Sequence, residues 1–157
     1  MLENSLFGKL LITFLISAVP IIELRGAIPF AVAHGLPLQM AYAVAVLGNL
    51  LPVPFIMLFA RKVFEIIRAH AKRLDAWVSK MEDRAIRKSA VVKKFSTFGL
   101  FLLVAIPLPG TGAWTGALVA AMLNMRIRRA FPAIALGVLA AGAIMLLASL
   151  GVDSLIS

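Results

Sequence analysis

The sequence predicts an all-α polytopic membrane protein built as an inverted repeat. Each half is a re-entrant broken hairpin plus one transmembrane helix, and a cytoplasmic amphipathic helix joins the halves. Three observations predict this class. The 157-residue chain is 62% hydrophobic and 15% charged, with a mean hydropathy of +1.00. Its basic residues are concentrated in two segments, and two of its apolar stretches are interrupted by proline and glycine.

The uncharged stretches are long enough to cross a bilayer. They run over 26–60, 95–125 and 130–152, whereas a hydrocarbon core needs about 20 apolar residues in helix. A soluble domain usually carries about 25% charged residues, so the composition excludes a soluble fold. We expect one membrane domain over 1–157, located in the cell (inner or plasma) membrane. The chain has no cysteine, which excludes disulfides and thiol chemistry.

The basic residues predict the orientation. Segment 61–94 holds 11 basic and 4 acidic residues, and a second basic segment follows residue 125. Lys and Arg beside membrane spans stay cytoplasmic, so both segments should face the cytoplasm. This requires that the blocks 7–34 and 95–123 each enter and leave the membrane on one side. Both termini then lie outside the cell.

The first half of the predicted repeat covers 7–60. Its block 7–34 breaks at Pro20-Ile-Ile-Glu-Leu-Arg-Gly-Ala-Ile-Pro29, where two prolines, a glycine and two charges interrupt the helix. The uncharged run before this break corresponds to about 20 Å of helix, too short for a core of roughly 30 Å. The span 38–60 follows the hairpin.

The second half covers 95–151 and repeats this order. Its block 95–123 breaks at Pro107-Leu-Pro-Gly-Thr-Gly112, a strong turn signal, and the span 130–151 follows. Gly26-Ala27 and Gly112-Ala113 align at a spacing of 86, and Gly48 aligns with Gly137 at 89. One crossing for each half makes the halves inverted, which is typical of transporters.

The segment 61–94 reads as an amphipathic linker helix lying on the cytoplasmic leaflet. The alternative is a solvated linker that only fixes the orientation. Topology already accounts for the positive charge, so we expect membrane lipid and no nucleic acid as its partner. We expect contacts with lipid headgroups from the second basic segment, through Arg126, Arg128 and Arg129.

Two charged residues lie at the first break, Glu23 and Arg25. Charges at membrane depth usually mark a substrate or ion path. Glu23 is therefore the candidate for proton coupling, since a carboxylate there can take up and release a proton. Arg25 is a candidate for binding an anionic substrate, because its planar fork suits phosphate or carboxylate. The alternative is a structural ion pair.

The second break carries no charge, so its contribution would come from the backbone. Gly110, Thr111 and Gly112 are candidate substrate-binding residues. A half-helix starting near Ala113 would direct free amides and the positive end of its dipole at the cavity. The alternative is a tight turn between packed half-helices.

Asn49 and Trp114 are candidates for a cavity or helix contact. A buried asparagine in a span most often bonds a neighbouring helix, and Trp114 either lines a cavity or packs. His34 and His70 have no companion ligands, so no metal site is expected. No P-loop, nucleophile elbow or paired histidines occur, so we expect neither an enzyme nor a cofactor.

At these residues the chain resembles the putative small multi-drug export protein family and, more distantly, the DedA (VTT-domain) superfamily. The resemblance covers roughly 15–150. Its marks are Pro20-Ile-Ile-Glu-Leu-Arg-Gly and Ile106-Pro-Leu-Pro-Gly-Thr-Gly, the latter followed by Asn124-Met-Arg-Ile-Arg-Arg-Ala-Phe131. It maps the glutamate of the DedA first hairpin onto Glu23. DedA members carry arginines around the second Pro-Gly, where this chain has Ala105 and Gly112.

The resemblance implies two facing re-entrant hairpins and proton-dependent movement of a lipid phosphate such as polyprenyl phosphate. The leading hypothesis is therefore a proton-coupled secondary transporter of a small amphipathic anion. One alternative is an exporter of small cationic drugs with Glu23 as counter-charge. Another is a non-transporting membrane scaffold. A homodimer is compatible with so few membrane elements.

Overall fold

The computed structural model describes residues 5–70, 96–108 and 110–156. Throughout these ranges the chain is helical and contains no strand, as predicted. The helices are α1 (Leu6–Ala18), α2 (Glu23–Ala33), α3 (Leu38–Leu50), α4 (Pro52–His70), α7 (Ser96–Ala105), α8 (Ala113–Met122) and α9 (Ile127–Ile156).

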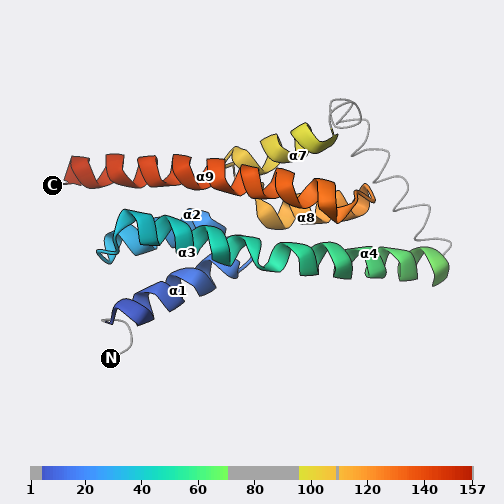
Figure 1. Ribbon diagram of the computed structural model, residues 1–157, viewed down its shortest axis with the longest axis horizontal. Coiled ribbons are helices and arrows are strands. Elements are labelled where there is room, and N and C mark those ends of the chain that lie inside the picture. The colour runs from blue at the N-terminus through green and yellow to red at the C-terminus, as the bar shows by residue number, and fades with distance from the viewer. Residues whose placement is uncertain (1–4, 71–95, 109, 157) are drawn as a thin grey trace.

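Two long apolar elements run side by side along the molecule. Leu51 keeps a helical conformation between α3 and α4, so the two form one rod, with α9 beside it in the opposite direction (Figure 1). The candidate membrane spans are Leu38–Ile66, of 29 residues, and Ile127–Gly151, of 25 residues. At 1.5 Å per residue they measure about 43 and 37 Å, enough for a hydrocarbon core of about 30 Å.

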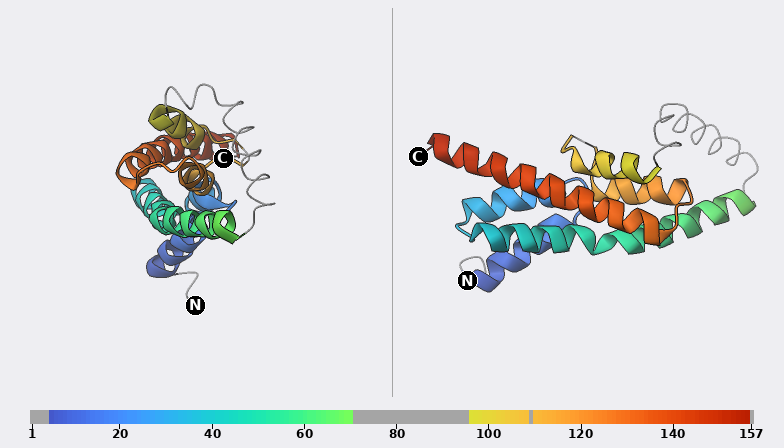
Figure 2. Two further views of the ribbon diagram at one scale, coloured as in Figure 1. Left: turned by 90° about the vertical axis from the view of Figure 1, so that its right-hand side faces the viewer. Right: turned by 45° about the horizontal axis from the view of Figure 1, so that its top comes forward.

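The shorter helices form two hairpins that turn back in the middle of the molecule. α1 leads inward from the end that carries both termini, and α2 returns to it. α7 leads inward from the opposite end, and α8 returns there (Figures 1 and 2). α1 packs on α3 and α7 packs on α9, whereas α2 also contacts α9 and α8 contacts α4.

The core where these helices meet is built from small side chains. Ala27 and Ala31 of α2 and Ala117 and Ala120 of α8 are completely buried. Gly48 lies so close to α1 that a Cβ would meet the backbone oxygen of Phe14. Short side chains let helix backbones approach, which maximises packing where lipid provides no hydrophobic drive.

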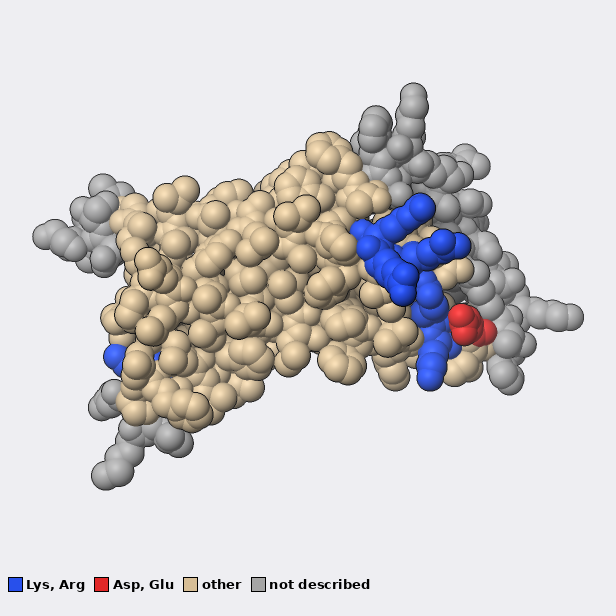
Figure 3. Space-filling view, viewed as in Figure 1, with Lys and Arg blue, Asp and Glu red and all other residues tan. Residues whose placement is uncertain are grey.

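The outer surface is apolar between two polar ends. Large side chains such as Leu47, Phe55, Leu136 and Leu147 are more than half exposed. Figure 3 shows a broad middle without charge, with most basic side chains gathered at one end and a small basic patch at the other. The exposed basic residues nearest that end in the fold are Lys62, Arg126, Arg128 and Arg129. An uncovered apolar belt of this kind suits a lipid environment.

The predicted linker helix needs a correction. Residues 61–70 belong to α4, which continues past the predicted end of the span at residue 60. The reason is local, since Arg61 and its neighbours favour helix. Arg61 also anchors this extension by donating from Nη2 to the Met125 oxygen at 2.8 Å. The rest of the predicted linker, 71–94, lies outside the described residues.

Candidate functional site

Glu23 is the first residue of α2 and lies at the tip of the first hairpin. α1 ends at Ala18, shortly before Pro20. Glu23 then adopts a left-handed backbone conformation, with φ of +51°. This conformation is uncommon outside glycine. It directs the side chain inward, where only 4% of the residue is exposed.

The Glu23 carboxylate caps the amino terminus of α8. Trp114 donates its backbone N–H to Oε1 at 3.0 Å, and the Ala113 amide faces the same carboxylate. The helix's own N-cap residue is Gly112, which offers no side chain to the free amides. A carboxylate from the other hairpin supplies the missing acceptor and complements the helix dipole.

Gly112 makes room for this contact. Its φ is +140°, and a Cβ built on it would overlap the Glu23 carboxylate. A larger residue would therefore displace the carboxylate as well as strain the backbone. The glycine predicted to bind substrate thus leaves space that a carboxylate of the same chain occupies.

A second contact joins the same two tips. Arg25 donates from Nη2 to the Thr111 hydroxyl at 2.7 Å. That hydroxyl also lies 2.7 Å from the Ile106 oxygen and 2.8 Å from the Leu108 oxygen. Thr111 thus links the arginine to the turn that precedes α8.

Trp114 provides a third contact between the tips. Its indole Nε1 donates to the Ala18 oxygen at 3.3 Å, a carbonyl left free by the end of α1. One residue therefore engages both sides of the first break, Glu23 through its amide and Ala18 through its ring.

The predicted site residues separate into three places. Glu23, Arg25, Thr111, Gly112 and Trp114 come together between the hairpin tips. Gly110 lies on the exposed side of this loop, where its oxygen accepts from the Thr115 hydroxyl at 3.0 Å. The basic turn lies near the far end, and no contact with the tips is present in the described residues. Its members are Arg126, Arg128 and Arg129.

Asn49 differs from expectation. It is 1% exposed, but neither Nδ2 nor Oδ1 has a hydrogen-bond partner among the described residues. The described residues therefore supply no hydrogen bond from Asn49 to a neighbouring helix. The sequence shows an amide inside a span, but the facing backbone and side chains depend on tertiary packing.

Two features of the site were not anticipated. The anion at the α8 amides is Glu23 itself, where we had expected an external substrate. Phe55, Phe59 and Lys62 form a groove with Trp114 on the side of α4. Their helical spacing was visible in the sequence, but the contribution of α8 was not. Among the described residues no cluster of His, Asp or Glu could hold a metal ion.

The described residues form an all-helical fold, and two of its helices are long and apolar enough to cross a membrane. The family model described as putative small multi-drug export protein matches residues 23–144. This match covers most of the chain, so the chain belongs to that family. No curated protein and no solved structure matches it. The distant relation to the DedA superfamily stays a prediction.

Proposed function

We propose that this protein is a proton-coupled secondary transporter of a small amphipathic anion. A lipid phosphate such as polyprenyl phosphate is the leading candidate substrate. The protein would be multi-pass in the cell membrane, with both termini outside and 61–94 in the cytoplasm. The chain would need no cofactor and would not act as an enzyme. The observation that carries the proposal is the Glu23 carboxylate on the α8 amides.

The proposed architecture is two re-entrant hairpins related by an inverted repeat. The proposal is supported by the similar way in which each hairpin packs on its long helix. Gly48 approaches the Phe14 oxygen and the Ser17 side chain, and Gly137 approaches the Phe101 oxygen and the Val104 side chain. Packing of α1 on α3 is thus repeated by packing of α7 on α9.

The returning half-helices support the same repeat. The Leu36 amide bonds the Ala31 oxygen after α2, and the Met125 amide bonds the Ala120 oxygen after α8. Both ends are Schellman motifs with a left-handed residue, Gly35 or Asn124. The four buried apolar positions of α2 recur 89 residues later in α8. They are Leu24, Ala27, Ile28 and Ala31, matched by Ala113, Gly116, Ala117 and Ala120.

The two predicted alignments do not fit this packing equally well. The spacing of 89 between Gly48 and Gly137 agrees with the packing, whereas the spacing of 86 for Gly26-Ala27 does not follow the buried faces. At 89, Glu23 corresponds to Gly112. The acid of one tip therefore faces the glycine at the equivalent position of the other tip.

Proton coupling follows from the chemistry of this contact. An ionised carboxylate binds backbone amides more strongly than a neutral acid does. Protonation of Glu23 would weaken the hold of the first hairpin on α8 and free the α8 amides. The freed amides and Arg25 could then receive the phosphate of a substrate. Opposed rocking of the two halves would give alternating access.

The charge arrangement favours an anion over a cation as substrate. Glu23 is buried and already engaged by the Trp114 amide, so it is poorly placed as a counter-charge for a cationic drug. Arg25 is only partly buried and presents a planar guanidinium group that suits phosphate or carboxylate. Export of cationic drugs remains the alternative, and the family description favours it.

Replacement of Glu23 by Gln tests the proposal. Gln retains an oxygen that can accept from Trp114 but cannot carry a titrating charge. We expect Glu23→Gln to abolish transport of a lipid phosphate driven by a pH gradient in proteoliposomes, with the unfolding temperature little changed. Glu65→Gln is the matched control, because Glu65 is exposed on α4. Full transport by Glu23→Gln would remove the coupling role.

A thermal-shift comparison separates the candidate functions. We expect stabilisation of the purified protein by lipid phosphates and not by quaternary amines. Stabilisation by amines alone would reverse the order of the two transport hypotheses. Stabilisation by neither, together with no transport of either substrate class by the unaltered protein, would favour the scaffold.

A further inference from the structure

We propose that a groove on the outer side of α4 is the binding groove for the lipid phosphate, with its chain against aromatic side chains and its phosphate at Lys62. This inference rests on the proposed function, since it names the place where the substrate of that transporter would lie. The groove is separate from the hairpin tips, although Trp114 belongs to both.

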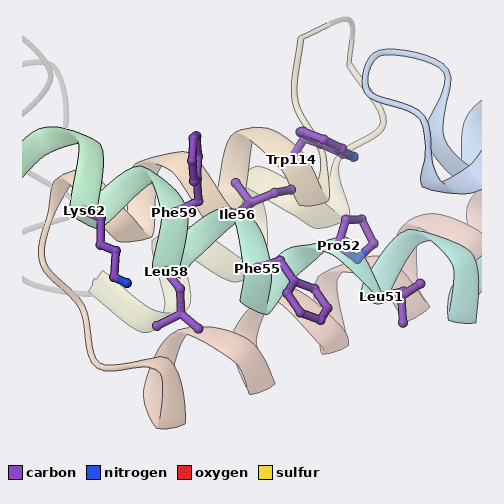
Figure 4. Close-up of a pocket in the computed structure, with 8 residues that line it drawn as sticks. All are labelled: Leu51, Pro52, Phe55, Ile56, Leu58, Phe59, Lys62 and Trp114. Carbon is purple, nitrogen blue, oxygen red and sulfur yellow. The ribbon is translucent and has the colours of Figure 1, made fainter.

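The groove has a volume of about 710 Å³. Its walls are aromatic and aliphatic and come mainly from α4, with Trp114 contributed by α8 (Figure 4). Phe55 and Phe59 are 66% and 71% exposed. Aromatic faces uncovered on a lipid-facing helix provide good contact area for a hydrocarbon chain.

The length of the groove matches one leaflet. Its lining extends along the chain from Leu51 to Lys62, which corresponds to about 16 Å of helix. Half of a hydrocarbon core of about 30 Å is a similar distance. The Leu51 end lies at the bend between α3 and α4, close to the level at which the hairpins turn (Figure 1).

The charge at the groove is suited to an anion. Among the described residues that line the groove, Lys62 alone is charged, and it is exposed. A lysine at this position can lay its carbon stem along the apolar wall and extend its ammonium to the headgroup level. The neighbouring basic turn, with Arg126, Arg128 and Arg129, adds positive potential at the same end.

Trp114 connects the groove to the tip contact. Its side chain lines the groove, while its backbone amide bonds Glu23. A chain that lies against the indole therefore contacts the residue that holds the carboxylate. In the proposed transporter, a lipid chain in the groove would alter the strength of the bond between the Trp114 amide and Glu23. Protonation of Glu23 would weaken that same bond.

Quenching of tryptophan fluorescence by brominated lipids tests the groove. The chain has two tryptophans, so Trp77→Phe leaves Trp114 as the single reporter. The protein is placed in nanodiscs that contain small amounts of brominated phosphatidic acid or brominated phosphatidylcholine with identical chains. One added basic contact favours the anionic lipid by about fivefold, so phosphatidic acid should quench Trp114 at about fivefold lower content.

Charge reversal at Lys62 separates the groove from general attraction to anionic lipid. We expect Lys62→Glu to abolish the preference and Lys62→Gln to reduce it. Arg129→Glu is the matched control, because Arg129 is an exposed arginine of the basic turn that does not line the groove. It should retain most of the preference.

Three results would overturn the inference. Equal quenching by the two lipids would mean that the groove contacts the surrounding bilayer lipid without selecting for a phosphate. An unchanged preference in Lys62→Glu would place the phosphate elsewhere. Absence of quenching by either lipid, together with cross-linking of Phe59→Cys between copies, would mean that a second chain covers the groove.

The binding assay contains no pH gradient, so its failure can be told apart from failure of the proposed function. A Lys62-dependent lipid preference together with full transport by Glu23→Gln would support the groove and reject the coupling role of Glu23. Proton-coupled transport without a Lys62-dependent lipid preference would support the coupling role of Glu23 and reject the groove.

Discussion

Glu23 illustrates how a tertiary contact can stabilise an unfavourable local conformation. Its φ of +51° would cost an isolated glutamate roughly 1 kcal/mol or more. The charge-assisted bond from the Trp114 amide offsets this cost. Strained residues of this kind persist where the surroundings fix them, and they concentrate at functional sites.

Gly112 offers a test of this contact. We expect Gly112→Ala to lower stability by about 2–3 kcal/mol more than a matched glycine replacement, because the new Cβ overlaps the Glu23 carboxylate. Gly35→Ala is the control, since Gly35 has a φ of +73° but open space around it. Thermal unfolding in detergent measures both. Equal losses would show that only backbone strain matters.

Thr111 gives a second test at the same scale. Thr111→Val keeps the shape of the side chain but removes the acceptor for Arg25 and the bonds to the turn. We expect a loss of about 1–3 kcal/mol in thermal unfolding. Ser149→Ala is the control, because that hydroxyl only donates to the Met145 oxygen one turn back in α9. A loss in Thr111→Val no larger than that of Ser149→Ala would contradict the tip contact.

At the scale of elements, each hairpin is held to its long helix by a close approach at one glycine. The missing side chain at Gly48 lets α1 pack closely on α3, and the missing side chain at Gly137 lets α7 pack closely on α9. Ser17 reinforces the first approach by donating its hydroxyl to the Ala45 oxygen. Val104 fills the corresponding place in the second. In each half the two contact residues lie three positions apart in the inward helix, at Phe14 and Ser17 or at Phe101 and Val104, but the side chains differ.

The repeat predicts matched effects at these glycines. Gly48→Leu and Gly137→Leu should each separate a hairpin from its long helix and lower stability by about 1–3 kcal/mol. Gly151→Leu should have little effect, because nothing lies within 4 Å of the Cβ position. Thermal unfolding is again the measurement. A large loss at only one of the two packed glycines would argue against equivalent halves.

Local signals predicted much of the element layout. Pro20 and the Pro-Gly turn before Ala113 end helices by removing amide donors and favouring tight turns. The structure confirms a break between Ala18 and Glu23 and the start of α8 at Ala113. The predicted interruption at Pro29 is wrong, because Pro29 lies within α2. The continuation of α4 past residue 60 was missed, because charge marks the edge of an apolar stretch and not the end of a helix.

The pairing within the site could not be predicted from the sequence. Trp114 and Glu23 are 91 residues apart in the chain, and no local pattern shows which acceptor will cap α8. The same reason applies to Asn49, because the groups that neighbouring helices present to its amide are set by tertiary packing. The positions of the two breaks identified candidate residues for the site but not the groups that they contact.

At the scale of the whole molecule, the apolar belt, the basic end and the positions of the termini determine the proposed orientation. Figures 1 and 3 show the termini at one end and most of the basic side chains of the described residues at the other. Positive-inside topology would place the basic end in the cytoplasm. Both ends of each hairpin would then lie on one side of the membrane, which is the central claim of this account.

Labelling of single cysteines measures that claim most directly, because the chain has no native thiol. Ser5→Cys and Gln39→Cys flank the first hairpin, and Thr97→Cys and Arg128→Cys flank the second. With an impermeant maleimide on intact cells, the first pair should label at once and the second pair only after permeabilisation. Labelling of Ser5→Cys and Gln39→Cys from opposite sides would mean that the first hairpin crosses the membrane completely, which would contradict the account.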